Sequence, residues 1–139
     1  MNYLQNTPKG KALVCGKEYQ TGEKVQEYQY KEIVSTPNKY TVQIGENKHA
    51  MGSDETWAIY VNHSCNPNTF FNIQTMSFYA RKNLSKGEEI TFNYLTTEHD
   101  MREQFECQCG SENCIKFIQG NKYLTEEKKN WVSKTAKIE

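Results

Sequence analysis

The most regular pattern in the chain is a short alternation of hydrophobic and polar positions. Residues 40–44, 76–80 and 90–94 each show it, and the last of them ends with Phe92 and Tyr94 on one face. Alternation with a period of two is typical of half-buried strands. Turn-forming stretches rich in Gly, Pro and Asn separate these segments at short intervals. The pattern therefore predicts a mostly β domain built from short strands.

Helical patterns are few. Ser53 and Asp54 are favourable N-cap residues and predict a short helix that runs to Tyr60. Near the C-terminus, Thr125 precedes two acidic residues and several lysines, an order that suits a helix and its macrodipole. The buried stripe of this C-terminal helix is expected to consist of Leu124, Trp131 and Val132.

The composition indicates a folded domain with a thin hydrophobic core. Only 36% of the 139 residues are hydrophobic, and Val, Ile, Leu and Phe together supply 25 residues. Disordered chains share such a low apolar content, but they also carry a large net charge. This chain has 17 basic and 17 acidic residues. We therefore expect a folded domain whose small core is supplemented by another source of stability.

Charge and hydropathy argue against several classes of function. A net charge of zero disfavours a general nucleic-acid-binding protein, and no apolar run is long enough for a membrane span. The polar residues 1–10 show no signal peptide, so we expect an intracellular protein, either cytoplasmic or nuclear. Five cysteines in such a chain suggest a metal site or reactive thiols more than a disulfide framework.

Four of the five cysteines have a spacing that suits a metal. Cys107, Cys109 and Cys114 lie within eight residues, and Cys65 precedes them by about forty residues. Zinc in structural sites prefers four tetrahedral ligands, commonly thiolates, and Gly110 allows a tight turn inside the cluster. The sequence predicts one structural zinc ion on these four residues, with a metal-free reduced cluster or a disulfide as the alternatives. Cys15 is expected to be a free thiol in the core.

Two further features place hydrogen-bonding groups in apolar surroundings. The segment 62–68, Asn-His-Ser-Cys-Asn-Pro-Asn, is by itself typical of a turn, with His63 as an ordinary core histidine. Tyr94 shares a face with Phe92, so its hydroxyl is expected to point inward, where it needs a hydrogen-bond partner. From the residues alone, both features favour a structural interpretation.

Three motifs in this order resemble the core of SET-domain protein lysine methyltransferases with a zinc-binding post-SET segment. The motifs are N-H-S-C-N-P-N at 62–68, G-E-E-I-T-F-N-Y at 87–94 and C-Q-C-G-S-E-N-C at 107–114. The similarity covers about residues 8–120. It implies a mostly β fold of small curved sheets, in which the Asn-His motif and the C-terminal segment cross in a knot-like manner, with short helices and a C-terminal helix.

The resemblance also implies a division of the chain and a reaction. Residues 1–100 would form the SET domain, 101–120 the post-SET zinc-binding segment and 121–139 the C-terminal helix or tail. The reaction would transfer a methyl group from S-adenosylmethionine to the ε-amine of a lysine in a protein, with a histone tail among the candidate substrates.

Each implied role falls on residues that match the family pattern. Tyr94 would be the catalytic tyrosine. The cofactor-binding residues would be Lys11, Ala12, Leu13, Asn62, His63 and Phe117. The substrate channel would be lined by Tyr28, Phe71 and Phe92. Phe92 lacks a hydroxyl, which favours the addition of more than one methyl group.

The chemistry of the reaction fits residues of these types. A free lysine amine has a pKa of ~10.4 and must lose a proton before it can attack. A sulfonium cation and an apolar channel both lower that pKa, and an aromatic wall tolerates the added methyl groups through cation–π attraction. A positioned hydroxyl then aligns the two reactants.

Two alternatives to an active protein methyltransferase remain open. The first alternative is a catalytically weak or inactive SET-fold module that binds zinc and cofactor, because Ala12 stands where many members of the family have glycine. The second alternative is a different substrate, either a non-histone protein or a free small molecule.

We expect a monomer or homodimer without direct nucleic-acid binding or membrane attachment. A basic peptide would need a local acidic groove, for which the candidates are Glu46, Asp54, Glu55, Glu98 and Asp100.

Overall fold

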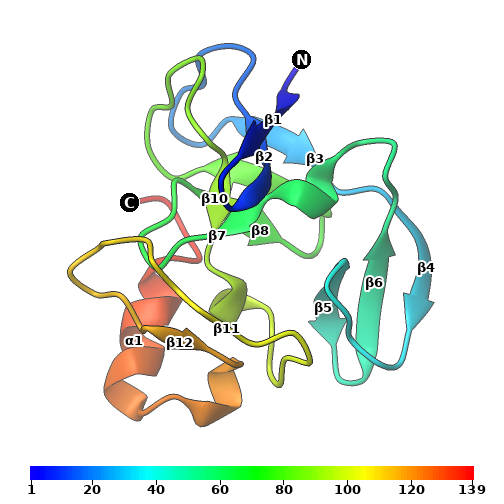
Figure 1. The fold of residues 1–139 in the computed structure, drawn as a ribbon, viewed down its shortest axis with the longest axis vertical. Coiled ribbons are helices and arrows are strands. Elements are labelled where there is room, and N and C mark those ends of the chain that lie inside the picture. The colour runs from blue at the N-terminus through cyan, green and yellow to red at the C-terminus, as the bar shows by residue number, and fades with distance from the viewer.

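In the computed structural model, which describes residues 1–139, the chain forms twelve short strands in five small sheets (Figure 1). The prediction of a mostly β domain is therefore confirmed. The antiparallel sheets are β1 (Tyr3–Thr7) with β2 (Gly10–Val14), β3 (Lys24–Glu27) with β9 (Ser77–Ala80) and β8 (Thr69–Asn72), β4 (Tyr30–Val34) with β6 (Lys48–Gly52) and β5 (Thr41–Gly45), and β11 (Phe105–Glu106) with β12 (Phe117–Ile118). The one parallel sheet pairs β7 (Asn62–His63) with β10 (Thr91–Phe92).

Helices are short and connect or close the sheets. Three are single 3-10 turns, and the C-terminal one is α-helical. They are η1 (Ala58–Tyr60), η2 (Tyr94–Thr96), η3 (Asn121–Tyr123) and α1 (Glu126–Lys134). In Figure 1, α1 and the β11–β12 hairpin lie together at one end of the molecule, away from β1 and the N-terminus.

Two glycine turns fasten the strands to one another. Gly22 and Gly87 have φ values of +86° and +90°, a region that residues with a Cβ rarely adopt. The N–H of Gly22 donates to the carbonyl of Ala80, and the N–H of Gly87 donates to the carbonyl of Cys15. These turns reverse the chain where a side chain would introduce strain.

Most of the hydrophobic core lies between the sheets and is rich in aromatic rings. It contains 15 buried residues, among them Leu13, Phe78 and Ile90, which are fully buried. Cys15 belongs to this core, as predicted for a free thiol. A separate small core attaches the C-terminal part through only four buried residues, which are Cys65, Leu95, Ile118 and Val132.

The helix predicted from Ser53 to Tyr60 is wrong. Only the single turn η1 forms, and Trp57 at its N-cap has a φ of +60° and makes no side-chain capping bond. The Ser53 hydroxyl instead accepts the N–H of Glu55, so that it closes a local turn. Side chains of this kind compete with helix formation by bonding to nearby backbone groups.

The predicted strand that ends at Tyr94 is too long. Strand β10 ends at Phe92, and Tyr94 begins η2. The side-chain oxygen of Asn93 accepts the N–H of Leu95 at 3.0 Å, and this cap turns the chain into a 3-10 helix. The C-terminal helix is confirmed, because the hydroxyl of Thr125 caps α1 by accepting the N–H of Lys128. Of the predicted stripe, Val132 is buried, whereas Leu124 and Trp131 are half-buried.

The residues after α1 are held by one buried arginine. Arg81 is 5% exposed, and its guanidinium donates to the carbonyl oxygens of Pro67, Lys134 and Lys137 at 2.7, 3.2 and 2.9 Å. Because Pro67 belongs to the Asn-His segment, this arginine fastens the end of α1 to that segment.

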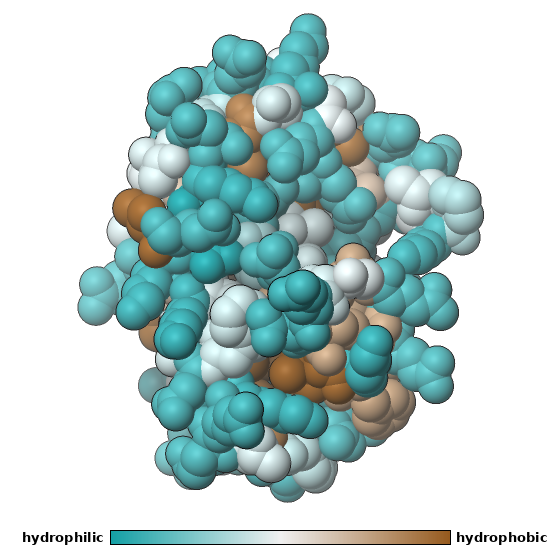
Figure 2. Space-filling view, turned by 90° about the vertical axis from the view of Figure 1, so that its left-hand side faces the viewer, coloured by the Kyte–Doolittle hydropathy of each residue, from teal (hydrophilic) through white to brown (hydrophobic).

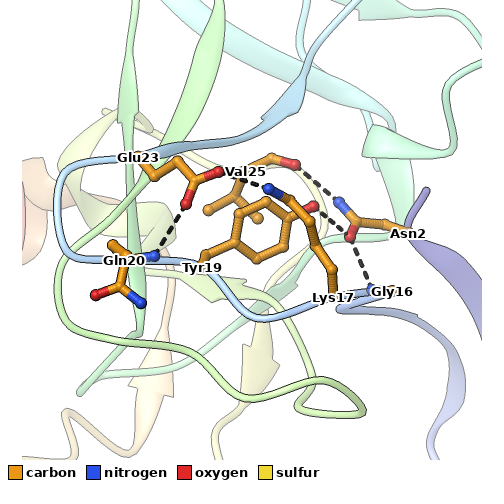
Figure 3. Close-up of polar contacts among 7 residues, drawn as sticks. All are labelled: Asn2, Gly16, Lys17, Tyr19, Gln20, Glu23 and Val25. Atoms are coloured by element: carbon orange, nitrogen blue, oxygen red, sulfur yellow. Dashed lines mark hydrogen bonds and ion pairs between the residues drawn. The ribbon is translucent and has the colours of Figure 1, made fainter.

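The N-terminal residues are anchored by a buried amide (Figure 3). The side-chain nitrogen of Asn2 donates to the carbonyl of Val25 at 2.8 Å, and its oxygen accepts the N–H of Gly16 at 3.0 Å and the hydroxyl of Tyr19 at 2.7 Å. Asn2 immediately precedes β1, so this network also fixes the position of β2, its partner strand.

The surface is mostly hydrophilic, in agreement with the low apolar content. On the face shown in Figure 2, apolar atoms occupy small separate areas, the largest of them in the lower half. None of the helices combines the length and apolar character that crossing a membrane requires.

Candidate active site and metal centre

The parallel pairing of β7 and β10 brings together two motifs that lie about thirty residues apart in the sequence. Asn62 pairs with Thr91 and His63 with Phe92, and the N–H of Ser64 donates to the carbonyl of Phe92 at 3.1 Å. Asn68 fixes the second motif, because its side chain accepts the N–H of Thr91 at 2.9 Å. Segments 62–68 and 87–94 therefore form one structural unit.

Asn62 connects this unit to β2. Its side-chain nitrogen donates to the carbonyl of Lys11 at 3.1 Å and to the carboxylate of Glu89 at 3.0 Å. The three residues expected to line the cofactor pocket from β2 are thus held beside Asn62. Of these, Ala12 and Leu13 are buried. The glycine expected at position 12 is not required by the backbone, since Gly10 has a positive φ (+114°) and Ala12 does not.

His63 lies between the tyrosine and the cysteine cluster, and both of its ring nitrogens are engaged. Nδ1 accepts the N–H of Tyr94 at 3.1 Å, and Nε2 lies 3.3 Å from the sulfur of Cys65. Because Nδ1 is an acceptor, the ring proton lies on Nε2 and is donated to the sulfur. Burial lowers the pKa of His63 to about 4, so the ring is neutral. The ring therefore has a structural role, and contact between His63 and a cofactor stays a prediction.

The Tyr94 hydroxyl points inward, as predicted. It donates to the carbonyl oxygen of Val61 at 2.8 Å. Burial, followed by the negative charges of Glu98 and Glu89, raises the pKa of this hydroxyl well above its ordinary value. Tyr94 is therefore a neutral hydrogen-bonding group in this structure.

An aromatic wall adjoins Tyr94. The rings of Phe92 and Tyr94 lie 4.9 Å apart, and those of Tyr28 and Phe71 lie 5.8 Å apart in an edge-to-face arrangement. Phe71 also contacts Phe92 at 6.3 Å, so the three predicted channel residues belong to one cluster with the tyrosine. The hydroxyl of Tyr28 donates to backbone carbonyl oxygens of residues 40 and 50.

Two aromatic residues of this cluster were not singled out by the sequence. Phe78 is fully buried and lies 5.1 Å from the ring of Phe92. Phe105 packs edge-on against both His63 and Tyr94, at 5.7 and 6.0 Å. The alternation in β9 identifies Phe78 as a core residue, but no sequence pattern places Phe105 next to the tyrosine.

The four predicted metal-binding cysteines come together. Their sulfur atoms all lie within 4.8 Å of one another, and those of Cys65 and Cys107 lie 3.9 Å apart. Tetrahedral coordination with zinc–sulfur distances of ~2.3 Å separates the sulfurs by about 3.8 Å, so the donor set fits zinc in number, chemistry and spacing. The sulfur of Cys65 also accepts the N–H of Ile115 at 3.3 Å.

The thiols of this cluster ionise unequally. Burial raises the pKa of Cys107 to about 11 and that of Cys65 further. Burial also opposes ionisation of Cys109, but hydrogen bonds from Ser111 and the neighbouring groups lower its pKa to about 6. A dication would bring all four thiols into the thiolate form.

Two of the remaining sequence candidates lie in unexpected surroundings. Phe117 is 44% exposed on β12, beside the cysteine cluster, and its contact with a cofactor stays a prediction. Among the acidic residues considered for a groove, Glu98 is buried. The other four are exposed, and they are Glu46, Asp54, Glu55 and Asp100.

Comparisons with known proteins agree with this geometry. The model of the SET domain family matches residues 5–95. The methyltransferase flvH of Aspergillus flavus is 43% identical over 65 residues, which are 45% of this chain and 36% of that protein. The histone-lysine N-methyltransferase, H3 lysine-36 specific, of Candida albicans is 42% identical over 67 residues, 44% of this chain and 8% of that protein. The chain thus spans about a third or less of the length of these curated relatives.

Solved structures are also similar. The structure of KRYPTONITE in complex with mCHG DNA and SAH matches with a TM-score of 0.66 and 25% identity, over 82% of this chain and 28% of that one. A second KRYPTONITE structure, with mCHH DNA, an H3(1–15) peptide and SAH, matches with a TM-score of 0.62. The mostly β arrangement of small sheets is therefore the fold of these structures.

Proposed function

Because the chain belongs to the SET domain family, we propose that it transfers a methyl group from S-adenosylmethionine to the ε-amine of a lysine in a protein substrate. The observation that supports this most strongly is the position of Tyr94. Its neutral hydroxyl is fixed by the carbonyl of Val61, and it lies between the Asn-His motif and an aromatic wall. This arrangement suits the alignment of an amine with an electrophilic methyl group.

We place the cofactor beside β2, next to the unit that segments 62–68 and 87–94 form. The backbone of Lys11, Ala12 and Leu13, with Asn62 and His63, would hold it, and Phe117 would cover its adenine. A sulfonium methyl supplies the electrophile. Ala12 lies within regular β2, so the structure gives no conformational support to an inactive module.

The amine is assigned to the aromatic side. Tyr28, Phe71 and Phe92 would surround the lysine side chain, and the apolar wall would favour the neutral amine that the reaction needs. Phe92 has no hydroxyl with which to hold a water molecule or to restrict rotation of a methylated amine. We therefore expect the addition of more than one methyl group.

The cysteine cluster is assigned a structural zinc ion. Cys65 belongs to the Asn-His motif and the other three ligands to the segment after Tyr94, so the metal would hold residues 101–120 against the SET domain at 1–100. Residues 121–139, which contain α1, would form the C-terminal part. His63 links this centre to the backbone of Tyr94.

For the substrate we propose a lysine-containing peptide segment of a protein, with histone H3 as the first candidate. The basis is the histone specificity named for one relative and the H3 peptide named in one structure. A histone substrate would place the protein in the nucleus. The absence of direct nucleic-acid binding stays a prediction from the zero net charge.

The decisive experiment measures the transfer of isotopically labelled methyl groups from S-adenosylmethionine to a library of lysine peptides that includes H3(1–15). We expect incorporation on at least one peptide and its loss in Tyr94→Phe, which keeps the ring but removes the hydroxyl. Equal transfer by Tyr94→Phe would contradict the role of the hydroxyl. A complete lack of transfer to peptides by the wild-type protein would contradict the proposed reaction.

A further inference from the structure

The imidazole of His63 bridges the cysteine cluster and the tyrosine. Its Nδ1 accepts the backbone N–H of Tyr94 at 3.1 Å, and its Nε2 lies 3.3 Å from the sulfur of Cys65. A backbone amide can only donate, so the proton of the neutral ring lies on Nε2 and points to the sulfur. One side chain therefore joins the proposed catalytic residue to a member of the proposed metal centre.

At the cluster end, two N–H groups approach the sulfur of Cys65. One is Nε2–H of His63, and the other is the backbone N–H of Ile115 at 3.3 Å. Cys65 is fully buried, so solvent does not supply a substitute donor. Hydrogen-bond partners of a metal ligand hold that ligand in place, and their removal typically weakens metal binding. The ring of His63 therefore supports the metal centre from outside its set of ligands.

At the tyrosine end, the ring fixes the first residue of η2. An N–H in the first turn of a helix has no partner within that helix, and His63 supplies the acceptor for the N–H of Tyr94. The Tyr94 hydroxyl donates to the carbonyl of Val61 at 2.8 Å. Because Val61 and His63 flank Asn62 in the sequence, one short segment holds both the backbone and the hydroxyl of the tyrosine.

The imidazole also packs against the segment that carries three of the four cysteines. Its ring lies edge-on to those of Tyr94 and Phe105, at 5.3 and 5.7 Å. Phe105 begins β11, immediately before the first of those cysteines, Cys107. The contact surface of the ring thus consists of the same two parts that its hydrogen bonds join.

We propose that His63 is a positioning residue that couples the metal centre to the tyrosine. It orients the backbone of Tyr94 for methyl transfer, and it strengthens metal binding through Cys65. This inference rests on the proposed methyl transfer and on the zinc ion assigned to the cysteine cluster. A histidine that only fills space in the core would contribute to stability and to neither of these properties.

Two substitutions separate the ends of this link. His63→Asn keeps an acceptor close to the position of Nδ1 but has no donor at the position of Nε2. We expect it to bind zinc about 10–100-fold more weakly than the wild type, measured in competition with a chromogenic chelator. In the cobalt-substituted protein, the sulfur-to-metal charge-transfer band should move to longer wavelength, because a thiolate without that hydrogen bond is a stronger electron donor.

His63→Gln should show the opposite pattern. Its amide lies close to the position of Nε2, so zinc affinity should stay near that of the wild type, but it has no acceptor for the N–H of Tyr94. We expect kcat to fall by about tenfold or more with little change in KM for the peptide, because a misplaced hydroxyl impairs alignment more than binding. The matched control is His49→Gln, which alters a buried histidine of β6 and should change neither zinc affinity nor kcat.

An NMR measurement separates failure of this inference from failure of the proposed reaction. In protein with isotopically labelled tyrosine, the amide signal of Tyr94 is identified by its absence in Tyr94→Phe. The hydrogen bond to Nδ1 should place the amide proton downfield. The signal should stay there in His63→Asn and move upfield in His63→Gln, although both variants lack the imidazole ring.

The inference is overturned if the Tyr94 signal is unchanged in His63→Gln, or if His63→Asn retains wild-type zinc affinity and an unshifted cobalt band. An active wild-type protein whose kcat is unchanged in His63→Gln also overturns it. A wild-type protein that transfers no methyl group, but whose variants change the zinc affinity and the amide signal as expected, contradicts the reaction and supports the link between Cys65 and Tyr94.

Discussion

Removal of the metal from the cysteine cluster should release the segment after Tyr94 while the remainder of the fold persists. The cluster joins Cys65 to the segment 105–118, and the core at that junction contains only four buried residues. Chelation is therefore expected to open the chain locally and to expose new cleavage sites within residues 95–120.

The magnitude follows from the size of this small core. Ordering the 14 residues at 105–118 costs about 20 kcal/mol, at roughly 1–2 kcal/mol per residue. Within this segment Ile118 is buried, and Phe105 and Ile115 are half-buried, which together contributes about 5 kcal/mol, at roughly 1.5–3 kcal/mol for a fully buried side chain. The deficit of about 15 kcal/mol lies within the ~10–16 kcal/mol that a structural zinc site supplies. Without metal, the segment is not stable in its folded position.

The assay is limited proteolysis with and without a chelator, with the cleavage sites mapped by mass spectrometry. Metal analysis should give about one zinc ion per chain in the wild-type protein and in Cys15→Ala, and less in Cys109→Ser. Added zinc should restore protection after chelation. A digestion pattern that chelation leaves unchanged would refute the reasoning and would mean that the small core suffices.

Three further predictions follow from individual residues. Gly120→Ala should weaken docking of the C-terminal segment by several kcal/mol, because a Cβ on Gly120 would collide with the carbonyl oxygen of His99. Gly110→Ala should be milder, because a Cβ there meets no atom within 4 Å. Chemical denaturation measures the loss of stability in both variants. The lowered pKa of His63 means that the unfolded chain binds more protons between pH ~6.5 and 4. The contribution of His63 to the free energy of unfolding is therefore complete above pH ~6.5 and falls by about 1.4 kcal/mol per pH unit as the pH drops toward 4. If the free energy of unfolding depends on pH in the same way in His63→Asn, the pH dependence does not come from His63. Phe92→Tyr should shift the product toward monomethyl-lysine in mass spectra of the peptide, and an unchanged product distribution would remove Phe92 from the control of methyl number.

Local sequence patterns anticipated the features that depend on neighbouring residues. The alternation predicted short strands, and Thr125 with its acidic neighbours predicted the start of α1. The same reasoning failed at Ser53, whose hydroxyl closes a local turn in place of a helix, and at Tyr94, where the cap at Asn93 ended the strand early. In these two places a single side-chain hydrogen bond outweighed the weak preference of the surrounding segment.

For the candidate site, too, the sequence predicts one part and only the folded structure shows the other. Its residue types and their order are readable from the sequence, including the cysteine spacing and the Asn-His motif, because each depends on a few adjacent positions. The relations between them are not readable. They include the hydrogen bonds that join His63 to Cys65 and to the backbone N–H of Tyr94, the packing of Phe105 on His63 and Tyr94, and the burial of Glu98 against β5.

The sequence by itself thus determined a charge-balanced, mostly β domain with a four-cysteine cluster and one inward-pointing tyrosine. The tertiary structure decided which groups are buried, which charges lack a partner and which motifs touch. Burial and electrostatic pairing depend on residues thirty to sixty positions away along the chain, as with Gln43 and Glu98, and only the folded arrangement of the sheets brings such residues into contact.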